Sequence, residues 1–303
     1  MTPLMRQCLA SVLVAFSCFV TTNCGRKEPL AEASAKPPEP VPAAPALAAE
    51  PKKMRIFWTE ELLQKELKFH NANYAGNGQF QFEGGEPYAV SLAGAQVTNL
   101  KALQGRPLKA LDLSDTPIVD LSPLKGMPLV ELYLERTQVT DLSALRGMAL
   151  QKLYLSGTPA RDLSALEGMP LVELNAVGTP VADLSPLRKC PIEMLWLTDC
   201  PVESIAALRG MPLVSVTLHR TRIRDLSPLA GSRLQRLHIG ETPVEDLSPL
   251  QGLNLTRLVF TPATIKAGWE AAKALPLQEV GTVFQDDAKD LSPPDVFWTK
   301  LGR

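Results

Sequence analysis

The chain is poor in aromatic residues and in histidine, and it carries almost no net charge. Aromatic residues make up 6% of its 303 positions, histidine occurs 3 times, and the formal net charge is −1 at pH 7. A near-neutral chain gives no reason to expect nucleic acid or an anionic membrane surface as its partner. Because aromatic residues are scarce, any group of them on one surface is a candidate for binding.

The motifs of common catalytic and cofactor sites are also missing. The sequence contains no P-loop, no G-x-S-x-G, no H-E-x-x-H and no C-x-x-C pair, and it contains no kinase catalytic domain. We therefore expect a protein that is not an enzyme, with no cofactor and no resident metal.

Cysteine is too rare and too badly spaced for a disulfide scaffold. Of the 5 cysteines, three lie within the first 24 residues, which leaves Cys190 and Cys200. The repeat described below places these two at opposite ends of one strand, beyond the Cα separation of about 7 Å that a disulfide tolerates.

No hydrophobic run is long enough to form an ordinary membrane-spanning helix. The apolar stretch LASVLVAFSCFV, residues 9–20, is about a dozen residues long and follows Arg6, whereas a spanning helix needs roughly 20 residues. This arrangement predicts a signal peptide over residues 1–24.

The end of this segment resembles a bacterial lipoprotein cleavage site, with Cys24 as the lipidated first residue of the mature protein. Thr21, Thr22 and Asn23 replace the usual Leu-Ala-Gly/Ser box, and Cys18 is a weaker candidate. The resemblance implies a lipoprotein of the bacterial cell envelope, attached to the membrane through Cys24. Ordinary secretion and an uncleaved anchor are the alternatives.

The next segment, residues 25–53, is a spacer rich in proline, alanine and glutamate. This composition favours an extended chain that cannot bury a core. We expect the folded part to begin near Met54, with an N-terminal cap over 54–86, repeats over 87–260, and a C-terminal cap and tail over 261–303.

The repeats have a period of 21 residues and the pattern L-x-x-L-x-L-x-x-T-x-V/I-x-D-L-S-x-L-x-G-M-P. A leucine or isoleucine opens each unit, at Leu108, Leu129, Leu150, Leu171, Ile192, Leu213, Leu234 and Leu255. The pattern resembles the leucine-rich-repeat family over about 170 residues. The wording "DLSPLKGMPL" is similar to repeats of certain bacterial proteins, in which such arrays also occur attached to serine/threonine kinases.

The resemblance implies an α/β solenoid: a right-handed superhelix with a parallel concave sheet of about nine or ten strands and a cap at each end. One short turn per unit predicts a convex side of 3₁₀ or irregular structure. Within each turn we expect a serine such as Ser122 to cap it, with Pro123 at its first position. We also expect a threonine ladder at the ninth position to bond exposed backbone.

The sequence also predicts the secondary structure of the two caps. Residues 59–67 predict a short helix, and the stretch GQFQFEGGEPYAVSL predicts a hairpin. At the other end, residues 264–276 predict a single helix with Trp269 turned inward, and Phe297 and Trp298 are placed to pack against it.

Strand alternation predicts which side chains face a partner. Positions 1, 4 and 6 of a unit face the core, and positions 3, 5, 7 and 8 face the concave surface. Position 5 supplies the predicted anchors Tyr133, Tyr154 and Trp196, together with His238; the alternative is that the aromatic rings only cover neighbouring leucines. Position 3 supplies the residues predicted to set specificity: Glu131, Lys152, Glu173, Met194 and Arg236.

Several other readings stay open. Glu131, Lys152 and Glu173 also fit a cross-strand charge ladder, and the like charges of Arg236 and Arg257 fit either a solvated face or an acidic ligand. His219 and His238 near Glu241 could hold a metal or serve acid–base chemistry. An aspartate column (Asp120, Asp141, Asp162, Asp183, Asp225 and Asp246) could suggest calcium, although each aspartate has a local capping role.

The favoured hypothesis is a binding module for a protein partner, and the alternative is binding of carbohydrate or peptidoglycan.

Overall fold

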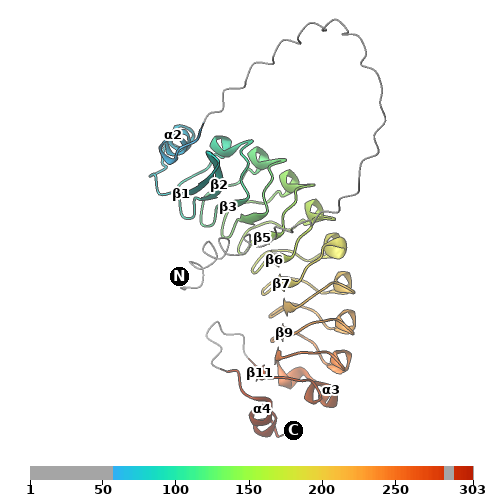
Figure 1. The fold of residues 1–303 in the computed structure, drawn as a ribbon. Helices are drawn as coiled ribbons and strands as arrows, with labels where there is room; N and C mark the ends of the chain where they lie inside the picture. Colours follow the sequence, from blue (N-terminus) through green and yellow to red (C-terminus); the bar gives the residue numbers. More distant parts are fainter. Residues whose placement is uncertain (1–56, 283–289, 303) are drawn as a thin grey trace, which may run out of the picture. The chain divides into compact units, whose positions relative to one another are not determined.

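The structure, a computed structural model, describes residues 57–282 and 290–302 (Figure 1). The predicted signal peptide, the lipidation site Cys24 and the spacer over 25–53 lie outside these residues.

The described residues form one 11-stranded sheet in which the strand order follows the chain. The first pair, β1 and β2, is antiparallel, and every later pair is parallel. The prediction of about nine or ten parallel strands is confirmed, because β2 to β11 run parallel. The strands are β1 (Gln79–Glu83), β2 (Glu86–Ser91), β3 (Ala110–Asp112), β4 (Glu131–Tyr133), β5 (Lys152–Tyr154), β6 (Glu173–Asn175), β7 (Met194–Trp196), β8 (Ser215–Thr217), β9 (Arg236–Ile239), β10 (Arg257–Phe260) and β11 (Glu279–Gly281).

Each unit of the repeat is one rung of this sheet, and equivalent positions pair directly. Leu132 of β4 is in register with Leu111 of β3 on one side and Leu153 of β5 on the other. Leu150, Leu153 and Leu155, at positions 1, 4 and 6 of one unit, are all 0% exposed. The same positions in the other units join them in one continuous apolar core, and each fully buried leucine contributes about 1.5–3 kcal/mol. The leucine-rich-repeat solenoid is therefore the fold.

Short 3₁₀ helices on the return leg of each unit run along the side opposite the strands (Figure 1). They are η2 (Lys101–Leu103), η3 (Ser122–Leu124), η4 (Ser143–Leu145), η5 (Ser164–Leu166), η6 (Ser185–Lys189), η7 (Ala206–Leu208), η8 (Ser227–Leu229), η9 (Ser248–Leu250) and η10 (Pro262–Thr264). The predicted 3₁₀ character of this side is confirmed.

In six of these turns the cap is the aspartate, which confirms its predicted capping role, and the prediction that Ser122 caps its turn is wrong. Asn99 and Ser204 take the place of the aspartate at η2 and η7. Asp120 Oδ1 accepts from the backbone N–H of Ser122 at 2.8 Å, and Asp120 Oδ2 accepts from the Ser122 hydroxyl at 2.8 Å. An Asx side chain reaches the N–H two residues ahead, so the serine is the residue that is capped. Because the carboxylates of this column are engaged in that way, they have a structural role that needs no calcium.

The predicted threonine ladder is present. The hydroxyl of Thr158 donates to the carbonyl of Leu155 at 2.7 Å, and the same bond recurs at Thr116, Thr137, Thr179, Thr221 and Thr242. Cys200 replaces threonine in one unit, and its thiol donates to the carbonyl of Ala176 at 3.0 Å.

The N-terminal end is covered as the sequence predicts. Helix α2 (Glu60–His70) begins after Thr59, whose hydroxyl oxygen accepts from the backbone N–H of Leu62 at 3.2 Å. Leu63 and Leu67 on its inner face are buried against the first rungs, and the β1–β2 hairpin follows it. Together these elements cover the apolar end that an open solenoid would expose.

At the C-terminal end the prediction of one helix over 264–276 is wrong. The structure has η10, and then a shorter helix, α3 (Trp269–Lys273). Gly268 separates them with a φ of +81°, and a Cβ there would lie 2.1 Å from the backbone nitrogen of Ser248. Glycine therefore allows the close approach that ends one segment and begins the next.

Aromatic rings gather at this end, around Phe260 of β10 rather than on the predicted helix. Trp269, Phe297 and Trp298 contact the ring of Phe260, with centroids 6.0, 5.9 and 6.2 Å away. Phe297 and Trp298 belong to helix α4 (Pro294–Lys300). Among the described residues, no helix combines the length and apolar character needed to cross a membrane.

Candidate partner-binding surface

The third and fifth side chains of each unit lie on the side of the sheet away from the buried fourth position, and we call this side the strand face. Tyr133, Tyr154, Trp196 and Met194 are all partly exposed there. In the middle rungs, therefore, the fourth side chain is buried and the third and fifth are partly exposed, as strand alternation predicts. This pattern does not hold everywhere, because Thr217 and Val259, also at position 5, are buried.

Three aromatic residues follow one another across the strand face, and we call Tyr133, Tyr154 and Trp196 the aromatic row. The rings of Tyr133 and Tyr154 stack with centroids 4.8 Å apart and planes 27° apart. Trp196, two rungs further on, leans toward Tyr154 with centroids 6.4 Å apart and a 31° tilt. Stacking of this kind fixes the rings relative to one another and adds to the area they bury.

Beside the aromatic row lies a charged ladder made of Glu131, Lys152 and Glu173. The ammonium of Lys152 lies 3.3 Å from a carboxylate oxygen of Glu131 and 3.7 Å from one of Glu173. The glutamate side chains are only 13% and 14% exposed. The predicted cross-strand charge ladder therefore exists in the structure, and its partial burial makes it stronger than a fully solvated ion pair.

The aromatic row and the charged ladder are bonded to each other, which the sequence reasoning missed. The Tyr133 hydroxyl donates to Glu131 at 2.9 Å, and the Tyr154 hydroxyl donates to Glu173 at 2.7 Å. Asn175 supports the same surface, since its Oδ1 accepts from the Ser156 hydroxyl at 2.7 Å. The signal was available for Tyr133, because tyrosine two residues after glutamate places both side chains on one face of a strand. For Tyr154 the glutamate lies on the neighbouring strand.

The seventh position was predicted to face the partner, and this prediction is wrong for most units. His219 is 1% exposed, and Ser114, Glu135 and Thr198 are also buried. The chain bends at the eighth position, where φ is +55° at Arg136 and +52° at Arg220, and the seventh side chain is enclosed between rungs. Burial raises the pKa of Glu135.

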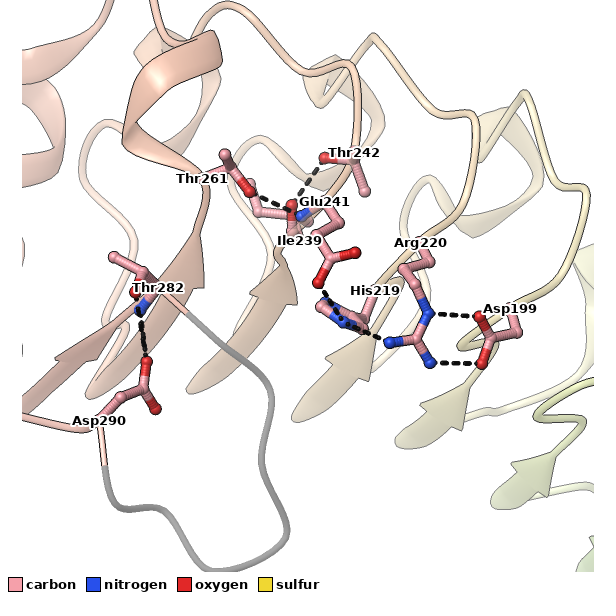
Figure 2. Close-up of polar contacts among 9 residues, drawn as sticks. All are labelled: Asp199, His219, Arg220, Ile239, Glu241, Thr242, Thr261, Thr282 and Asp290. Atoms are coloured by element: carbon pink, nitrogen blue, oxygen red, sulfur yellow. Dashed lines mark hydrogen bonds and ion pairs between the residues drawn. The ribbon is translucent and has the colours of Figure 1, made fainter.

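Figure 2 shows the histidine region near the C-terminal rungs. His219 Nε2 lies 3.4 Å from Glu241 and 3.2 Å from the guanidinium of Arg220. Arg220 in turn donates two hydrogen bonds to Asp199, at 2.5 and 2.6 Å. Burial, followed by the positive charge of Arg220, lowers the pKa of His219. Both effects favour the neutral form of the ring.

His238 is partly buried in β9, with Thr217 beside it in the sheet. Burial, reinforced by the charge of Arg257, lowers its pKa to about 4. Arg236 and Arg257 are in register on adjacent strands, but only Arg257 has an ion-paired partner among the described contacts, Glu279 at 2.5 Å. Arg236 is exposed to solvent.

Ion pairs along the edge of the strand face were also missed. Arg136 donates to Asp115 at 2.5 and 2.6 Å, and Arg220 and Asp199 repeat the arrangement further along. Both pairs occupy the eighth position of adjacent units, so opposite charges spaced by one repeat length were the signal. They are largely exposed and contribute little stability.

The geometry limits the other chemistries considered for this chain. Within residues 57–282 and 290–302, no three His, Cys, Asp or Glu side chains come together in an arrangement that could hold a metal ion. Cys190 and Cys200 are free and buried, and burial raises the pKa of both thiols. A thiol in that state is a poor nucleophile.

Comparison with known proteins gives structural neighbours. No protein-family model matches the chain, and no curated protein matches it. An internalin (inlF) from Listeria monocytogenes is similar with a TM-score of 0.54 and 26% identity, over 72% of this chain and 69% of the internalin chain. An internalin C2 from the same species is similar with a TM-score of 0.56 and 24% identity, over 66% of this chain and 92% of the other.

These neighbours are bacterial leucine-rich-repeat proteins, which agrees with the fold read from the sequence.

Proposed function

We propose that this protein is a non-enzymatic protein-binding module that presents its strand face, the predicted concave side, to a protein partner. The observation that carries the proposal is the aromatic row: three large, partly exposed rings on one face of the sheet, of which Tyr133 and Tyr154 stack and Trp196 tilts toward Tyr154. The internalin neighbours support it, since they share the fold of a repeat array.

The physical basis is a stiff surface that loses little freedom on binding. Each rung is held by parallel pairing on both sides, and tyrosine and tryptophan bury large areas with few rotatable bonds. Ten parallel rungs at about 4.8 Å each give a sheet of roughly 43 Å, which suits a protein surface or an extended segment. The charged ladder, Met194, His238 and Arg236 then set specificity around the anchors.

Carbohydrate binding is the second candidate, because tyrosine beside carboxylate also suits a sugar. Sugars stack on the open faces of aromatic rings, however, and Tyr133 and Tyr154 already cover one face of each other at 4.8 Å. Each ring of the stacked pair therefore has one face fewer to offer a sugar. This favours a protein over a glycan.

The test replaces the three rings at once and follows binding in the full-length chain. Cells producing the wild type or Tyr133→Ala/Tyr154→Ala/Trp196→Ala are cross-linked intact, and the captured partners are identified by mass spectrometry. We expect the triple variant to lose the major cross-linked protein while its melting temperature stays nearly unchanged.

The matched control is Phe69→Ala, which removes a ring that is 83% exposed on α2, away from the strand face. It should capture the partner normally. Capture that survives in the triple variant would refute the assignment, and retention of cell-wall material in a sedimentation assay would replace it with the carbohydrate candidate.

We further propose that the module is held at the bacterial cell envelope through a lipid on Cys24, with ordinary secretion as the alternative. Replacement of Cys24 by Ser removes the lipidation site and leaves the folded part intact. The variant should lose metabolic labelling by a fatty acid and move from the membrane fraction to the soluble fraction. Unchanged fractionation would reject the anchor.

A further inference from the structure

We infer that the partner is cationic where it covers the aromatic row: it brings a lysine or arginine side chain to the site formed by Tyr133, Tyr154 and the charged ladder. This inference rests on the proposed function and names the chemistry of the partner at that surface. Four observations carry it.

The first observation is the charge of the strands that bear the site. From β3 to β6 the ionised side chains are three carboxylates, Asp112, Glu131 and Glu173, and one ammonium, Lys152. This part of the strand face therefore has an excess of two negative charges. A surface of one sign attracts a partner of the other sign and repels its like.

The second observation is that the charged ladder is one cation short. Glu131 and Glu173 share the single ammonium of Lys152, at 3.3 and 3.7 Å. Both carboxylates are mostly removed from water, at 13% and 14% exposure. Charges that are partly desolvated are screened less than surface charges, so the uncompensated negative charge acts strongly on a docked group.

The third observation is how the tyrosine hydroxyl groups are used. Each donates to a carboxylate, Tyr133 to Glu131 and Tyr154 to Glu173. Donation of this kind keeps the glutamates oriented toward the aromatic row. A guanidinium or ammonium placed there meets carboxylate oxygens and aromatic rings together, and both attract cations.

The fourth observation is the opposite charge of the far end. In β8 to β10 the ionised side chains are Arg236 and Arg257, which are in register on adjacent strands, and Arg257 is paired with Glu279 of β11. His238, two residues after Arg236 on β9, is held neutral at pH 7 by burial and by the charges of Arg257, His219 and Arg236. Five rungs separate β4 from β9, about 24 Å at 4.8 Å each. This exceeds the screening length of about 8–10 Å, so the two ends act independently and a cation is directed to the aromatic end.

The test measures the affinity of short peptides for the folded protein. The probes are fluorescein-labelled Gly-Arg-Gly-Arg-Gly-Arg amide, the same peptide with glutamate in place of arginine, and labelled chitohexaose, followed by fluorescence anisotropy at low ionic strength. We expect the arginine peptide to bind, the glutamate peptide and the sugar to bind at least about tenfold more weakly, and added salt to weaken the arginine complex.

Charge variants locate the binding. Glu173→Gln keeps an acceptor for the Tyr154 hydroxyl and removes one charge, so we expect about tenfold weaker binding of the arginine peptide. Glu131→Gln/Glu173→Gln should weaken it further, and Lys152→Gln should strengthen it. The matched control is Glu167→Gln, which removes the same charge on the side of the 3₁₀ turns, where Glu167 pairs with Lys189 at 3.5 Å.

The outcomes separate this inference from the proposed function. Equal binding of the arginine peptide by wild type, Glu131→Gln/Glu173→Gln and Glu167→Gln would overturn the inference, as would preference for the glutamate peptide or for chitohexaose. If the glutamine variants still capture the cellular partner and the aromatic triple variant does not, the protein-binding proposal stands and the cationic partner falls. If the triple variant also captures it, both fall.

Discussion

Acidification should destabilise this protein through His238, and the size of the effect follows from its surroundings. Burial in β9, then the positive charges of Arg257, His219 and Arg236, lower the pKa of His238 to about 4, and Asp290 opposes this shift. The ordinary value in an unfolded chain is about 6.5. The folded state therefore prefers the neutral ring, and the unfolded state takes up a proton first as the pH falls.

The sign and magnitude follow by linkage. The stabilising effect of the neutral ring is complete above about pH 7 and is lost as the pH falls from about 6.5 to 4, because the unfolded chain binds the proton throughout that window. At pH 5 the loss is about 2 kcal/mol, and below pH 4 it approaches about 3 kcal/mol. Either value is a large fraction of the stability of a typical domain.

The assay is urea unfolding of wild type and His238→Gln at pH 7.5 and at pH 5.0. We expect the wild type to lose about 2 kcal/mol more than the variant between these pH values. With only 3 histidines in the chain, an NMR titration of histidine ring protons reads the pKa directly, and the resonance missing in His238→Gln assigns it. A titration of that resonance near pH 6.5, or equal losses in the two proteins, would refute the reasoning.

Three further outcomes test the fold and the histidine region. Thr158→Val removes the hydroxyl that donates to a buried carbonyl three residues earlier and should cost about 1 kcal/mol in urea unfolding; no loss would mean that the ladder is dispensable. Gly268→Ala, where a Cβ would lie 2.1 Å from backbone, should lower the melting temperature well beyond Gly252→Ala, whose Cβ would meet nothing within 4 Å at a similar φ of +77°; equal shifts would show that only the dihedral matters. Arg220→Gln should raise the pKa of His219 in the same NMR titration, because the guanidinium charge helps to lower it; an unchanged value would remove Arg220 as a cause.

The repeat made most of the fold predictable. A fixed period places equivalent residues in register on neighbouring strands, so one correct reading of Leu132 and its neighbours applies to every rung. The helix predicted over 264–276 failed at the point where the period ends. There the conformation of Gly268 depends on how closely its backbone approaches Leu247 and Ser248, and that contact has no local signature in the sequence.

The candidate site was predictable in position but not in chemistry. Alternation along a strand brought Tyr133, Tyr154 and Trp196 to one face, and equal spacing put Lys152 between two glutamates. Spacing alone does not say which rotamer a side chain adopts, and the bonds from tyrosine hydroxyl to carboxylate depend on rotamers. The burial of His219 was missed for a different reason: it follows from the backbone bend at the next residue, Arg220.

Under the proposed function, the residues that differ from one rung to the next are the ones that select the partner. The fourth position is leucine in successive rungs and 0% exposed, as at Leu132, Leu153 and Leu174, because a change there would open a cavity. The fifth position has no such constraint, and it varies from aspartate in β3 to tyrosine in β4 and tryptophan in β7. Aromatic residues cost nothing in core packing at these positions, yet they are scarce in the rest of the chain. Their concentration on three nearby rungs, with both tyrosines bonded to partly buried carboxylates, is the observation that the proposed docking of a protein partner explains.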